Sequence, residues 1–150
     1  MSVNGTGDGE YVVHVRPRWS DMDAFGHVNH ANMVTLLEEA RVPLLFGEAP
    51  GDGLAEFAKG IVVVRLSVDY RSPVVVDGRD VRVEITLSEL RHASFTLSYT
   101  VHNGPSGSDP VAVTARTTLA PYDVGGSRPR RLTATEREFL RTRIPGGPPA

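Results

Sequence analysis

RWSDMDAFGHVNHANMVTLLEEAR, residues 18–41, joins a polar loop directly to an amphipathic helix. The second half of this stretch, with the residues that follow it, repeats apolar side chains at helical spacing: Met33, Leu36, Leu37, Ala40 and Leu44. The spacing predicts a helix over residues 31–46, with Asn29 or Asn32 as its N-cap. Pro43 removes a backbone donor, so it is expected to kink the helix or end it early.

The residues on both sides of this stretch alternate between apolar and polar, which is the period of a half-buried strand. One strand is predicted before the helix, from Tyr11 onward, and four are predicted after it. Their apolar faces are Val62, Val64, Leu66, Val68 and Tyr70; Val81, Val83, Ile85 and Leu87; Phe95, Leu97, Tyr99 and Val101; and Val111, Val113, Ala115, Thr117 and Leu119. Short polar connections between the last three strands indicate antiparallel hairpins.

One amphipathic helix and five one-sided strands bury their apolar surface most simply when the sheet wraps around the helix. We therefore predict an α+β fold with a five-stranded antiparallel sheet around one long helix. Residues 11–123 form this domain, after a flexible N-terminus at residues 1–10.

Residues 124–150 form a tail of different character. Thr133 and Glu136 have the spacing of a capping box, which predicts a short helix over residues 134–143. Its apolar side chains are expected to dock on the domain: Phe139, Leu140 and Ile144.

The composition excludes several classes of function. The formal net charge of -2 gives no positive field for nucleic acid. The absence of Cys removes disulfides, thiolate ligands and a Cys nucleophile, and fits a reducing compartment. Neither a signal-peptide pattern nor an apolar run of roughly 18 residues is present. We expect a cytoplasmic protein that binds neither nucleic acid nor membrane.

The loop before the predicted helix concentrates the residues able to do chemistry: Asp21, Asp23, His27, Asn29 and His30. A carboxylate beside a helix N-terminus, with its unpaired N–H groups and partial positive charge, suits acyl transfer or hydrolysis. The alternative is that Asp and Asn are there only to satisfy turns.

Other motifs fit poorly. Asp21, Asp23 and Gly26 resemble the start of a calcium loop, but Asn32 stands where the bidentate Glu is needed. His27 and His30 could share a metal, yet no third ligand is marked. There is no G-x-S-x-G elbow, Walker loop or G-x-G-x-x-G. We expect no cofactor and no metal.

Residues 18–41 resemble the signature of the 4-hydroxybenzoyl-CoA thioesterase-like branch of the hotdog superfamily, D-x-D-x-x-G-H-V-N-N followed by a helix ending near E-x-A-R. DYRSPVVVDGRDVRVEI, from Asp69, is similar to the family's tyrosine-to-proline turn and next strand. The resemblance implies a hotdog fold and an acyl-CoA thioester hydrolase, active at the interface of a homodimer or homotetramer.

The resemblance also assigns roles to residues. Asp23 matches the catalytic carboxylate, acting as nucleophile or as general base. The backbone N–H of His30 matches the oxyanion donor. Gly26, His27 and Asn29 match positions that shape the loop and bind substrate, with Gly26 expected where the chain approaches the substrate closely.

Two residues depart from the family pattern, since His30 replaces the second Asn and Met33 replaces the helix Tyr. Because of these two departures, the resemblance does not identify the acyl group of the substrate. Two other functions stay open. One is a hotdog hydratase, although hydratases of this fold have a His five residues after the Asp, whereas His27 is four residues after Asp23. The other is a non-catalytic acyl-CoA-binding or regulatory domain.

Several arginines are candidates for contacts to coenzyme A phosphates. The alternative is that these side chains only face solvent. The candidates are Arg71, Arg79, Arg128, Arg130 and Arg131.

Overall fold

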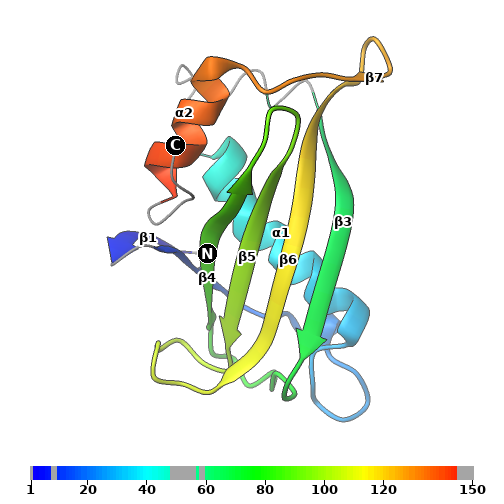
Figure 1. Ribbon diagram of the computed structural model, residues 1–150. Coiled ribbons are helices and arrows are strands. Elements are labelled where there is room, and N and C mark those ends of the chain that lie inside the picture. Colours follow the sequence, from blue (N-terminus) through cyan, green and yellow to red (C-terminus); the bar gives the residue numbers. More distant parts are fainter. Residues whose placement is uncertain (1, 8–9, 48–56, 58–59, 145–150) are drawn as a thin grey trace.

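A computed structural model describes residues 2–7, 10–47, 57 and 60–144 (Figure 1). Its elements in chain order are β1 (Ser2–Gly7), β2 (Glu10–Val15), the 3-10 turn η1 (Trp19–Asp21), α1 (His30–Phe46), β3 (Ile61–Tyr70), β4 (Val81–Leu90), β5 (Phe95–His102), β6 (Val111–Asp123), β7 (Arg128–Pro129) and α2 (Ala134–Arg143). All strand pairs are antiparallel, in the order β1-β2-β4-β5-β6-β3, and β7 pairs with the end of β6. The predicted α+β class is confirmed.

The core lies between α1 and the sheet, with the long helix running behind the strands in Figure 1. The predicted helical stripe is buried: Met33, Leu36, Leu37, Ala40 and Leu44. The predicted apolar faces of β4 and β5 are buried against it, as is that of β6 apart from Val111 at its start. Each large side chain buried in this way contributes roughly 1.5–3 kcal/mol relative to exposure, so this packing positions the helix start.

Helix α1 starts one residue earlier than predicted and ends at the predicted residue, Phe46. Asn29 is the cap, and its Oδ1 accepts a hydrogen bond from the Ala31 N–H at 2.9 Å. Of the two effects expected of Pro43, a kink or an early end, the early end is wrong, because the helix continues to Phe46. Leu44 and Leu45 are both buried, and their burial offsets the missing hydrogen bond.

The predicted common face of β3 is wrong in its first half. The register against β6 shifts between Val63 and Arg65, so Val64 is a bulge residue. Val63 pairs with Leu119, and the inner face continues at Leu66, Val68 and Tyr70. Alternation within one strand gives no sign of a bulge, because a bulge depends on the partner strand.

Two strands add to the five predicted ones. β1 pairs with β2 at one edge, where the sequence pattern predicts no strand, and β7 pairs with β6. The tail helix has the predicted bounds, and Leu140 and Ile144 are fully buried. No described helix is long and apolar enough to cross a membrane.

The predicted capping box at the start of α2 also contains an ion pair. Thr133 and Glu136 bond each other's backbone N–H groups, at 2.8 and 3.1 Å. The carboxylate of Glu136 accepts both terminal nitrogens of Arg130, at 2.8 and 2.9 Å. Burial raises the pKa of Glu136, but the bonds from Arg130 and Thr133 outweigh it and leave that pKa below its ordinary value of 4.5.

Glu136→Gln is therefore expected to lower stability by about 1–3 kcal/mol at neutral pH. Because the folded pKa is depressed, the stabilisation is present above the ordinary pKa and is lost as pH falls through the folded pKa. Urea unfolding of both proteins at a series of pH values measures this. A gap between them that does not shrink in acid would contradict the assignment.

Candidate active site

Asp23 lies in a tight loop that fixes one of its two carboxylate oxygens. Its backbone N–H donates to the His27 carbonyl at 2.8 Å. Its Oδ1 accepts from the N–H groups of Phe25 and His27, at 2.8 and 3.2 Å. Oδ2 has no hydrogen-bond partner among the described residues, so the loop orients the carboxylate and leaves one oxygen available.

Gly26 allows this loop to close. Its φ is +79°, in the left-handed region that favours glycine. A Cβ placed there would meet no atom within 4 Å. Within this chain the glycine is therefore explained by its backbone angle rather than by a close neighbour.

The neighbouring carboxylate, Asp21, has a different role. It is buried, and its oxygens accept the backbone N–H of Arg18 at 2.7 Å and the Arg18 guanidinium. Its carbonyl accepts the Asn29 N–H at 2.8 Å and the Asn32 side chain at 3.3 Å. Asp21 thus ties the loop to the helix start.

The start of α1 presents an unused donor beside this loop. The caps and turns use the N–H groups of Asn29, Ala31 and Met33. The His30 N–H has no acceptor within the described part of the chain. An unbonded N–H at a helix N-terminus is suited to a developing negative charge on oxygen.

A cavity of about 400 Å³ joins these features. Asp23, His27, His30 and Met33 line one side of it, and the end of β3 with the turn after it lines the other. The second side consists of Tyr70, Arg71, Ser72, Pro73 and Val74, with Val113 of β6. Of the predicted site residues, the structure brings together Asp23, His27 and His30, whereas Gly26 and Asn29 do not line the cavity.

Tyr70 is a site residue that sequence reasoning assigned only to a strand face. Its hydroxyl donates to the backbone carbonyl of His30 at 2.5 Å, across forty positions of sequence. Burial raises the pKa of Tyr70, so the hydroxyl keeps its proton and remains a donor. The bond holds the helix start against the edge strand. The similarity of residues 69–73 to a family motif was the available signal.

The turn after β3 is held against the Asp23 loop by backbone bonds. Val28 N–H donates to the Val74 carbonyl at 2.8 Å, and Val76 N–H donates to the Gly26 carbonyl at 3.1 Å. His27 and Val75 form an antiparallel bridge between them. The two walls of the cavity are therefore one small paired unit, in which residues 26–28 meet residues 74–76.

Known proteins share this architecture. Residues 17–144 match the family model described as the thioesterase-like superfamily. No curated protein matches the chain.

Solved structures give the same picture. A thioesterase from Thermus thermophilus, complexed with coenzyme A and Zn, is 28% identical, with a TM-score of 0.73 over 93% of this chain and 96% of that one. The probable thioesterase YbaW from Escherichia coli is 25% identical, with a TM-score of 0.70 over 91% and 98%. The 1,4-dihydroxy-2-naphthoyl-CoA thioesterase Slr0204 from Synechocystis, at 16% identity, shares the fold, with a TM-score of 0.72 over 88% and 96%.

The family match covers the paired loop, the capped helix and the sheet that carries them. The three similar structures named above are described as thioesterases or, for YbaW, as a probable thioesterase. The chain therefore belongs to the thioesterase-like superfamily and has its hotdog fold.

Proposed function

We propose that the protein hydrolyses an acyl-coenzyme A thioester, with Asp23 as the catalytic carboxylate. One observation carries the proposal: a carboxylate with one uncommitted oxygen lines the same cavity as a helix start whose first N–H is unbonded. The relative from Thermus thermophilus that contains coenzyme A supports the choice of thioester.

The chemistry needs few groups. In one route Asp23 takes a proton from water, and the resulting hydroxide attacks the thioester carbonyl carbon. In the other Asp23 Oδ2 attacks that carbon and forms an anhydride, which water then cleaves. In both routes, the His30 N–H donates a hydrogen bond to the carbonyl oxygen and stabilises the negative charge that develops on it. The C–S bond then breaks, and because a thiolate leaves readily, no strong acid is required.

The outer edge of β3 supports the expected homo-oligomer. Within the described ranges, β3 pairs with β6 on one side only. Its exposed apolar side chains are Val62, Val63, Val64, Leu66 and Tyr70. Long, apolar, unpaired strand edges invite pairing with another chain. We propose that β3 pairs with its copy in a two-fold dimer, which would also place a second subunit beside the cavity that Tyr70 lines.

The arginines considered as contacts for coenzyme A phosphates differ in their position and in their ion pairs. Arg71 lines the cavity and forms no ion pair within the described part of the chain. Arg79 is bound to Asp77 at 2.8 Å, and Arg130 to Glu136. Arg128 and Arg131 do not line this cavity. Arg71 is therefore our candidate for a phosphate contact.

Arg71→Ala is expected to raise KM for an acyl-CoA by about tenfold while leaving kcat within about twofold, because it removes ground-state binding of phosphate. The matched control is Arg79→Ala, which removes an arginine already paired with its neighbour. A truncated substrate, the acyl pantetheine without phosphates, should show no difference between the variants. Equal KM values for both variants toward acyl-CoA would refute the role of Arg71.

Steady-state release of thiol from short, medium, long and aromatic acyl-CoA thioesters tests the proposed function. Turnover on one class identifies the acyl group. Binding of acyl-CoA without turnover would favour a non-catalytic binding domain. Water addition to an enoyl-CoA without thiol release would favour a hydratase.

A further inference from the structure

A recess lies on the outer face of the sheet, opposite the core. Figure 1 is viewed onto this face of β5, β6 and β3, with α1 behind the strands. The recess has a volume of about 400 Å³. We name it the outer recess, and its lining residues are Arg65, Ser67, Glu89, Thr96, Arg116 and Thr118. None of them lines the cavity that contains Asp23, so the outer recess is a separate feature of the surface.

Strand pairing places these side chains in two adjacent rows. The first row, read across β4, β5, β6 and β3, consists of Glu89, Thr96, Thr118 and Arg65. In the second row Ser67 of β3 pairs with Arg116 of β6. Residues two apart on a strand point to the same face, so Arg65 and Arg116 are diagonal neighbours on it. Such positions are roughly 7–8 Å apart, within reach of two long side chains that share one ligand.

The positive charges in the outer recess are not balanced by the chain. Arg65 and Arg116 are exposed and form no hydrogen bond or ion pair with any described residue. The carboxylate of Glu89 is bonded to Arg91 at 2.6 Å, and Arg91 lies at the margin of the recess. The recess and its margin therefore hold three guanidinium groups against one carboxylate, although the whole chain has a formal net charge of -2.

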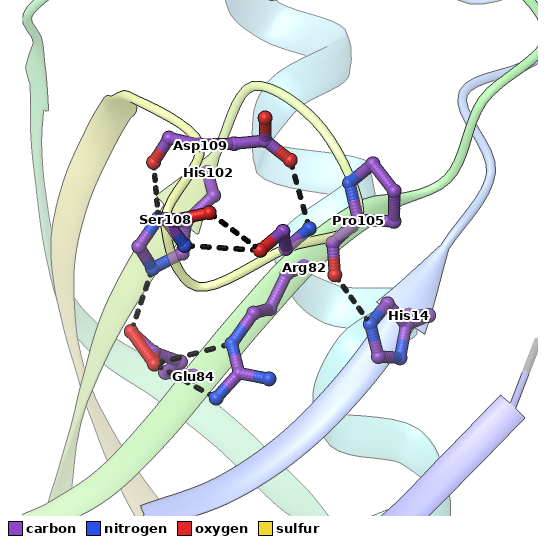
Figure 2. Close-up of polar contacts among 8 residues, drawn as sticks. His14, Arg82, Glu84, His102, Pro105, Ser108 and Asp109 are labelled. Atoms are coloured by element: carbon purple, nitrogen blue, oxygen red, sulfur yellow. Dashed lines mark hydrogen bonds and ion pairs between the residues drawn. The ribbon is translucent and has the colours of Figure 1, made fainter.

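Another arginine of the outer face shows the contrast. Arg82 of β4 donates to one oxygen of Glu84 from Nε and Nη2, at 3.3 and 3.2 Å. The other oxygen of Glu84 lies 2.7 Å from Nε2 of His102 (Figure 2). This face of the sheet thus pairs an arginine with a carboxylate at β4. Arg65 and Arg116 repel each other instead, and an anion between them would remove that repulsion.

Hydroxyl groups complete the lining. Thr96 is only 6% exposed, and its Oγ1 lies 2.9 Å from Oγ1 of Thr118. One of these two hydroxyls donates to the other, so the pair keeps one O–H that is not used between them. Ser67 adds a third hydroxyl. Guanidinium groups with hydroxyl donors beside them are the usual protein contacts to phosphate oxygens.

We propose that the outer recess binds the phosphate group of an anionic ligand between Arg65 and Arg116. A phosphate with two negative charges matches two guanidinium groups, and each planar guanidinium can donate two parallel hydrogen bonds to two phosphate oxygens. Two sources have this chemistry. One is the nucleotide end of the coenzyme A substrate, which rests on the proposed function, and the other is a separate small phosphorylated molecule.

Titration of the whole ¹⁵N-labelled protein with inorganic pyrophosphate tests the site. At low ionic strength, saturable shifts are expected at the Nε–Hε resonances of Arg65 and Arg116. Arg65→Gln and Arg116→Gln should each weaken binding by about tenfold, because each removes a charge-assisted contact. Both side chains are exposed, so both variants should fold. About 0.15 M sodium chloride should weaken binding further.

The matched control is Arg79→Gln, because Arg79 is an exposed arginine that is already paired with Asp77 at 2.8 Å. Its affinity for pyrophosphate should equal that of wild type. The absence of saturable shifts at Arg65 and Arg116 would overturn the proposal. An affinity that is unchanged in both recess variants, or lowered equally by Arg79→Gln, would overturn it as well.

Kinetics distinguish the two sources of phosphate. If the substrate supplies it, Arg65→Gln and Arg116→Gln should raise KM for acyl-CoA by about tenfold and leave KM for the acyl pantetheine unchanged. If a separate ligand supplies it, KM should stay unchanged for both substrates while pyrophosphate binding is still weakened. Both results support the recess. The titration requires no turnover, so failure of the recess and failure of the thioesterase proposal are separate results.

Discussion

Asparagine in place of Asp23 is expected to lower kcat for acyl-CoA hydrolysis by about 10³-fold or more. Asparagine keeps the shape of the side chain and can still accept the N–H bonds from Phe25 and His27 through its one oxygen. It supplies neither a base for water nor a carboxylate nucleophile. The fold and acyl-CoA binding should therefore persist while turnover is lost, which stopped-flow thiol release and calorimetric binding measure.

The matched control is Asp21→Asn, two residues away in the same loop. Asp21 is 2% exposed and is bonded to Arg18 rather than placed in the cavity. This variant should lose about 1–3 kcal/mol of stability and retain kcat in its folded fraction. If Asp23→Asn keeps more than a tenth of wild-type kcat, Asp23 is not the catalytic carboxylate.

The second large effect is expected at the edge strand. Leu66 lies near the middle of β3, so in a two-fold antiparallel pairing it lies near the axis, and two copies of an introduced charge would approach each other. Leu66→Asp should convert the proposed dimer to a monomer, because burying an unpaired carboxylate costs several kcal/mol. The value of kcat/KM should then fall by about 100-fold, because no second subunit would lie beside the cavity.

The monomer itself should tolerate this change, since Leu66 is 40% exposed in the single chain. Val124→Asp is the control: Val124 is 63% exposed but lies outside the strands. Sedimentation velocity and activity on the same samples give the comparison. A Leu66→Asp protein that remains dimeric and active would exclude pairing through β3.

Much of the fold could be predicted because its elements obey strong local rules. The stripe from Met33 to Leu44 and the alternation in β4, β5 and β6 depend on burial of one face, and the capping box of α2 is a local pattern. The bulge at Val64 and the strand β1 could not be predicted, since both depend on a partner strand. The early helix end predicted from Pro43 is wrong because burial of the two leucines that follow it outweighs the loss of a backbone hydrogen bond.

The candidate site also has one part that could be predicted from the sequence and one part that could not. Asp23, His27 and His30 occur together in one loop, so sequence alone could group them, and the structure places all three at one cavity. The opposite wall comes from residues 70–74, forty positions away. Neither the bond from Tyr70 to His30 nor the contact of His102 with Glu84 leaves a trace in sequence spacing, because both join separate elements through single side chains.

We propose that water cleaves a thioester under the control of Asp23. Mass spectrometry of the products formed from an acyl-CoA in ¹⁸O-labelled water tests it most directly. Over many turnovers, wild type is predicted to release one free coenzyme A thiol for each free acid, with ¹⁸O in the acid, and Asp23→Asn to release neither above background. Intact thioester in the wild-type reaction, or labelled acid formed equally by Asp23→Asn, would contradict the account.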